Sequence, residues 1–123
     1  MGERVAWSRE DIIVAYALYC ITPLNDMRPS NKLIQQVADG FSHSVSSLVM
    51  RMKNFAAIDP NSKVKGATHA AKTDRLIFDE FKNDWGTLSV QAESLTGLAL
   101  FDANPINGAK PLSSLTDKNR VSR

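Results

Sequence analysis

Residues 44–57 read SVSSLVMRMKNFAA. Apolar side chains recur in this stretch at spacings of three and four residues, the period of one face of an α-helix: Val45, Leu48, Val49, Met52 and Phe55. Ser44 is a suitable N-cap, and Asp59-Pro60 is a suitable end. The face opposite the apolar stripe carries hydroxyl, polar and basic side chains: Ser46, Ser47, Met50, Arg51, Lys53 and Asn54. The stretch therefore predicts a helix with one buried face and one outward face.

Two further helices are predicted before this one. Ser8 is a suitable N-cap for an amphipathic helix that ends near Ile21, where Pro23 follows. A helix from Ser30 to Asp39 is next, and Gly40 is typical of the left-handed residue that follows a helix. Because the turn at residues 40–43 is short and contains glycine, residues 7–57 predict a trihelical core that resembles a helix-turn-helix.

The rest of the chain predicts two more helices and a tail. Apolar residues at helical spacing favour helices at residues 73–84 and 87–96, the second with Thr87 as its N-cap. From residue 100 onward, prolines, glycines and polar residues are typical of a tail or linker. We therefore expect an all-α fold of four to five helices, with a helical domain at residues 1–99 and a tail at residues 100–123.

Length and composition limit the alternatives. A chain of 123 residues has the length of one domain. It contains no apolar run long enough for a transmembrane helix, and its first residues lack the pattern of a signal peptide. Cys20 is the single cysteine, which excludes an internal disulfide and is consistent with a reducing, cytoplasmic compartment. With His43 and His69 far apart in the sequence, we expect no metal site and no cofactor.

The charges are unevenly distributed along the chain. Residues 44–77 have a net charge of +4, whereas residues 1–43 have −1 and residues 78–99 have −3. A helix with a basic outward face can enter the major groove of DNA, which is about 12 Å wide. We therefore expect double-stranded DNA as the partner of the outward face of residues 44–57. The loop that follows supplies the predicted phosphate contacts: Lys63, Lys65, His69 and Lys72. A trihelical unit that serves only as a scaffold or docking module remains an alternative at this point.

A family resemblance points in the same direction. Three groups of residues carry it: Trp7-Ser8-Arg9-Glu10-Asp11 with Tyr16 and Tyr19; Val49 to Phe55 with Asp59-Pro60; and Lys72, Asp74, Phe78, Glu80 and Phe81. Over Trp7 to Asp84, the chain resembles the N-terminal domain of bacterial HNH-type restriction endonucleases. The trihelical core is also similar to Myb/SANT-like folds. The resemblance implies a DNA-binding module of a restriction or defence nuclease system, with a nuclease subunit or domain as partner.

The chain departs from such nucleases in one respect. An HNH nuclease needs a general-base histidine and further metal ligands, and the two histidines here do not supply that set. We therefore expect no enzymatic activity from the chain itself. The alternative function is that of an interaction adaptor, which would dock a partner protein or a second copy in a homodimer. It would use the acidic helix at residues 73–84 and the apolar stretch Leu95–Phe101.

Overall fold

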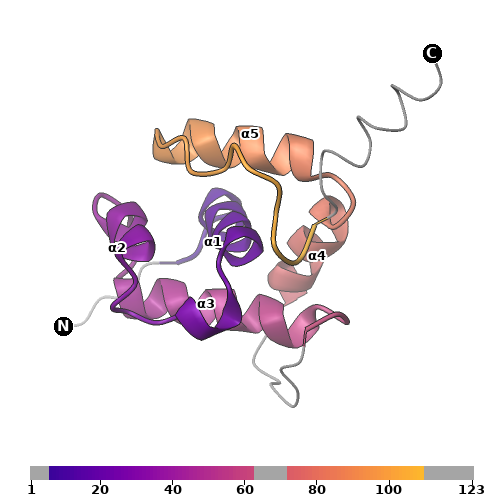
Figure 1. Cartoon of the computed structure of the whole chain (residues 1–123), viewed down its shortest axis with the longest axis horizontal. Coiled ribbons are helices and arrows are strands. Elements are labelled where there is room, and N and C mark those ends of the chain that lie inside the picture. Colours follow the sequence, from indigo (N-terminus) through magenta and orange to yellow (C-terminus); the bar gives the residue numbers. More distant parts are fainter. Residues whose placement is uncertain (1–5, 63–71, 110–123) are drawn as a thin grey trace.

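The computed structural model describes residues 6–62 and 72–109, and within these ranges it contains helices but no strand (Figure 1). The helices are α1 Arg9–Ile21, the 3-10 turn η1 Leu24–Asp26, α2 Lys32–Ala38, α3 Val45–Ile58, α4 Lys72–Phe81 and α5 Trp85–Thr96. The predicted all-α fold class is confirmed. No helix in the described part of the chain has both the length and the apolar character needed to cross a lipid bilayer.

Two of the predicted N-caps are confirmed. The Ser8 hydroxyl accepts a hydrogen bond from the Asp11 amide at 3.1 Å, and the Asp11 carboxylate accepts one from the Ser8 amide at 3.2 Å. This reciprocal pair is a capping box. Ser44 caps α3 by accepting a hydrogen bond from the Ser47 amide. Gly40 has φ +92°, so the prediction of a left-handed residue after α2 is also confirmed.

Two other predicted N-caps were wrong by one and three residues. Asn31, not Ser30, caps α2, because its carboxamide oxygen accepts hydrogen bonds from the Leu33 and Ile34 amides. Asp84, not Thr87, caps α5, because its carboxylate accepts a hydrogen bond from the Thr87 amide. Asn31 lies one residue after Ser30, and Asp84 lies three residues before Thr87. All of these residue types are suitable N-caps, so each observed cap is a close competitor of the predicted one.

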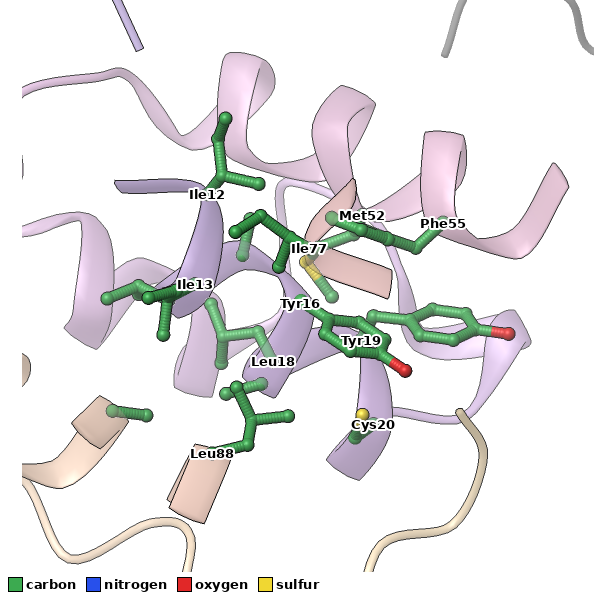
Figure 2. Close-up of a cluster of buried hydrophobic side chains, with 14 of the residues drawn as sticks. Ile12, Ile13, Tyr16, Leu18, Tyr19, Cys20, Met52, Phe55, Ile77 and Leu88 are labelled. Carbon is green, nitrogen blue, oxygen red and sulfur yellow. The ribbon is translucent and has the colours of Figure 1, made fainter. Parts of the chain in front are cut away.

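α1 is the central helix of the protein. Figure 1 shows it between α3 on one side and α5 on the other, and α1 also contacts α4. Every residue from Ile12 to Cys20 is buried. Figure 2 shows side chains of α1 packed with Met52 and Phe55 of α3, Ile77 of α4 and Leu88 of α5. The prediction of an amphipathic first helix was therefore wrong. A helix that is covered on all sides is apolar all round, and Ala15 and Ala17 of α1 are as fully buried as its larger side chains.

The chain after α5 also differs from the predicted tail. Phe101 is 2% exposed and Ala109 is 5% exposed. The Trp85 indole nitrogen donates a hydrogen bond to the Ala103 carbonyl at 3.0 Å, and the Phe101 ring packs edge-on against Trp85. Residues 100–109 therefore belong to the folded domain, because they cover apolar surface that α1 and α5 leave open. The remainder of the predicted tail, residues 110–123, lies outside the described residues.

Candidate nucleic-acid interface

The outer face of α3 is the candidate interface. α3 contacts α1, α2 and α4, and these helices bury Leu48, Val49, Met52 and Phe55. On the other side, four of the predicted contact residues are exposed: Ser46, Ser47, Met50 and Lys53. Met50 is 61% exposed. From Val45 to Ile58 the helix contains no acidic residue, so nothing on α3 itself repels a phosphate.

Arg51 and Asn54 do not share this exposure. The Arg51 guanidinium donates to one carboxylate oxygen of Asp74 at 2.7 Å, and the Asn54 amide donates to the other at 3.1 Å. The Arg51 side chain is only 16% exposed and that of Asp74 is fully buried. The prediction that Arg51 and Asn54 face DNA was therefore wrong. Their polar groups join α3 to α4, because a buried carboxylate must be paired.

Trp7 and His43 complete this buried cluster. The Arg51 guanidinium lies 4.4 Å from the centre of the Trp7 ring, and the His43 ring stacks on Trp7 with centroids 3.8 Å apart. His43 Nε2 lies 3.1 Å from the Asp11 carboxylate, and its side chain is 6% exposed. His43 therefore has a structural role in the turn before α3 and does not face a phosphate. The chain of contacts holds the N-terminal end of α1 to the turn and to α3.

The sequence contained one signal for this cluster that we missed. Asp74 has the helical spacing of Ile77, Phe78 and Phe81, which are the buried residues of α4. An acidic residue at an apolar position requires a partner, and Arg51 is the basic residue that supplies it. The sequence alone does not identify that partner, since the two residues are 23 positions apart.

The other predicted contact residues lie at the start of α4 or before it in the sequence. Lys72 begins α4 and is exposed, and the neighbouring Arg75 is exposed as well. Lys63, Lys65 and His69 lie outside the described residues. Among the described residues of the basic segment 44–77, the exposed cations are therefore Lys53, Lys72 and Arg75.

The acidic residues of α4 are largely paired within the chain. Arg9 makes two hydrogen bonds to the Glu80 carboxylate, at 2.7 and 2.6 Å, and these lower the pKa of Glu80. Lys82 lies 3.4 Å from Asp79. In the apolar stretch predicted for the adaptor, Phe101 is buried and Leu98 and Leu100 pack against the core, while Leu95 is 45% exposed. Most of the apolar stretch in the adaptor hypothesis is therefore packed in the fold, whereas the acidic side chains of α4 stay on the surface.

A second buried polar cluster lies at the other end of α1. The Tyr19 hydroxyl donates a hydrogen bond to the Asp59 carboxylate at 2.7 Å, and Asp59 is 4% exposed. Burial, and then Asp59, raise the pKa of Tyr19. This bond fixes the C-terminal end of α3, which Asp59 caps, to the C-terminal end of α1. Within the described residues, no three His, Cys, Asp or Glu side chains gather as metal ligands would.

Comparisons with protein-family models, with curated proteins and with solved structures found no significant match. A functional proposal for this chain therefore rests on the geometry of α3 and the residues around it.

Proposed function

We propose that this chain is a DNA-binding module that contacts duplex DNA with the outer face of α3. The observation that carries the proposal is an exposed helical face with hydroxyl groups and one lysine, on a helix without acidic residues. Serine hydroxyls and helix N-termini contact phosphates, and lysines add affinity that does not depend on sequence. Lys72 and Arg75 are further exposed cations, in the first turn of α4.

The pairing of Arg51 and Asn54 with Asp74 bears on how the module would recognise DNA. Bidentate arginine or asparagine contacts are the common readers of guanine and adenine, and here both side chains are engaged inside the protein. The side chains that remain on α3 contact mainly backbone phosphates. We therefore infer that the module binds duplexes with little sequence preference and that its affinity depends strongly on salt.

Lys53→Glu is expected to weaken binding of a duplex about tenfold. It is also expected to make the slope of log affinity against log salt concentration less steep, by about the amount that one phosphate contact contributes. Fluorescence anisotropy at two salt concentrations measures both quantities. Lys82→Glu is the matched control, because it changes the net charge equally but lies at the end of α4, beside Asp79. Equal effects of the two reversals, or duplex binding that does not respond to salt, would contradict the proposal.

The likeness of Trp7–Asp84 to the front domains of HNH-type restriction endonucleases supports the narrower proposal that this module serves a restriction or defence nuclease. On this proposal the chain binds DNA without cutting it. Incubation of the purified chain with plasmid and Mg²⁺ is expected to leave the plasmid intact on a gel. Cleavage that is abolished by a chelator would contradict the non-catalytic assignment.

A further inference from the structure

Residues 105–109, which we call the strap, close the C-terminal end of α1. The last carbonyl groups of a helix have no partner within the helix. Here the Ile106 and Asn107 amides donate to the Cys20 carbonyl at 2.6 and 3.1 Å, and the Asn107 side chain donates to the Tyr19 carbonyl at 2.5 Å. The strap, which has no regular secondary structure, thus provides hydrogen-bond donors for two carbonyl groups in the last turn of the central helix.

The strap covers a thiol and a hydroxyl. Cys20 and Tyr16 are fully buried. Among the described residues, the Tyr16 hydroxyl has no nitrogen or oxygen partner, and Figure 2 shows it pointing toward the Cys20 sulfur. A thiol is only a weak hydrogen-bond partner for a hydroxyl, so this position favours access of a stronger polar partner when the cover is removed.

The strap leaves no space for a substituent on the sulfur. Gly108 has φ +80°, and a Cβ atom placed on it would lie 2.7 Å from Cys20 Sγ. The strap therefore packs directly on the sulfur. Burial also raises the pKa of Cys20 to about 12, which keeps the thiol protonated and unreactive while the strap is in place.

Of the five strap residues, only Ala109 is buried. Ile106 is 62% exposed, and hollows lie on both sides of the segment. One, of about 470 Å³, is lined by Leu24, Ile106 and Asn107 among others; the other, of about 150 Å³, is lined by Phe78, Lys82 and Gly108 among others. Segments with few buried side chains and no regular structure open at a lower free-energy cost than the whole domain.

We propose that the strap opens independently of the helical core and makes Cys20 a site of reversible thiol modification, in which an adduct on the sulfur holds the strap open. The modifying group is a low-molecular-weight disulfide. The Cys20 thiolate attacks one sulfur of that disulfide, a mixed disulfide forms, and the other half leaves as a thiolate. The proton lost from Cys20 goes to solvent. Reduction by a second thiol restores Cys20, and the strap closes again.

The test is the rate at which an aromatic disulfide, dithionitrobenzoate, labels the full chain without denaturant. Asn107→Ala removes one strap hydrogen bond and is expected to accelerate labelling about three- to tenfold. Val37→Ala is the matched control, because Val37 is buried in α2 and the substitution destabilises the whole fold. It is expected to leave the labelling rate at the wild-type value. Cys20→Ala reports the background reaction.

Two results would overturn the proposal. In the first, Val37→Ala accelerates labelling by the same factor as it raises the global unfolding constant measured in urea, so that Cys20 is reached only through global unfolding. In the second, Asn107→Ala leaves the labelling rate unchanged. Hydrogen exchange of the wild-type protein gives an independent check. The Ile106 and Asn107 amides are expected to exchange faster than the amides of α1, and equal protection would contradict an independent strap.

The adduct is tested separately with oxidised glutathione. The mixed disulfide is expected to keep the helical circular dichroism of the unmodified chain, to lose exchange protection at residues 105–109, and to recover it after dithiothreitol. Loss of the helical signal on modification would show that the adduct unfolds the helical core, and this would contradict an opening confined to the strap. This proposal does not depend on DNA binding, so either can fail without the other.

Discussion

Arg51→Ala is expected to lower the free energy of unfolding by about 3 kcal/mol, because it removes a guanidinium that pairs with the fully buried Asp74 carboxylate. The substitution also removes the contact with the Trp7 ring. Urea denaturation monitored by circular dichroism measures the change. An outward-facing arginine on the same helix would give a change within about 0.5 kcal/mol, so the size of the effect separates a structural arginine from a DNA-reading one.

Two variants serve as controls for Arg51. Lys53→Ala lies two positions along α3 on the exposed side and is expected to change stability by less than about 0.5 kcal/mol. The double variant Arg51→Met/Asp74→Leu replaces both charges with apolar groups and is expected to recover much of the loss. Equal stability of Arg51→Ala and Lys53→Ala would contradict the buried pair.

The second large effect concerns the helical core. A chain that ends after Asp84 is expected to be unfolded, although it contains the whole predicted trihelical unit. Without α5 and residues 97–109, one side of α1 loses its cover, which includes Trp85, Leu88 and Phe101. Loss of buried side chains of this size costs about 3 kcal/mol each, and a domain has only about 5–15 kcal/mol of stability in total. Circular dichroism and urea denaturation of the shortened chain measure the result.

Substitutions in α5 test the same dependence in the full chain. Leu88 is fully buried against α1, whereas Val90 is 66% exposed. We expect Leu88→Ala to lower stability by about 3 kcal/mol and Val90→Ala by less than about 0.5 kcal/mol. A shortened chain that folds cooperatively, together with a small effect of Leu88→Ala, would show that the chain up to Asp84 folds without α5.

Local signals in the sequence located the helices well. The hydroxyl groups of Ser8 and Ser44, the glycine after α2 and the Asp59-Pro60 end of α3 all act within one turn of the chain. The errors at Ser30 and Thr87 have the same local origin, since a competing acceptor at Asn31 or Asp84 lies within three residues. Such competition depends on small differences in geometry that a sequence pattern does not contain.

The candidate interface was predicted only in part. The spacing of Ser46, Ser47, Met50 and Lys53 placed these residues correctly on the exposed side of α3. The same spacing also placed Arg51 and Asn54 on the outward face, but a partner on another helix holds their polar groups. That partner is Asp74 on α4, and no local pattern connects it with α3.

The sequence by itself determined that this chain forms helices, where most of them begin and end, and which side of α3 is apolar, because caps and helical periodicity act between near neighbours. Only the tertiary structure decided that α1 is buried on all sides, that Arg51 pairs with Asp74, and that residues 105–109 cover Cys20. These features depend on contacts between segments 23 to 88 residues apart, whose packing fixes which polar groups reach water and which must find partners inside.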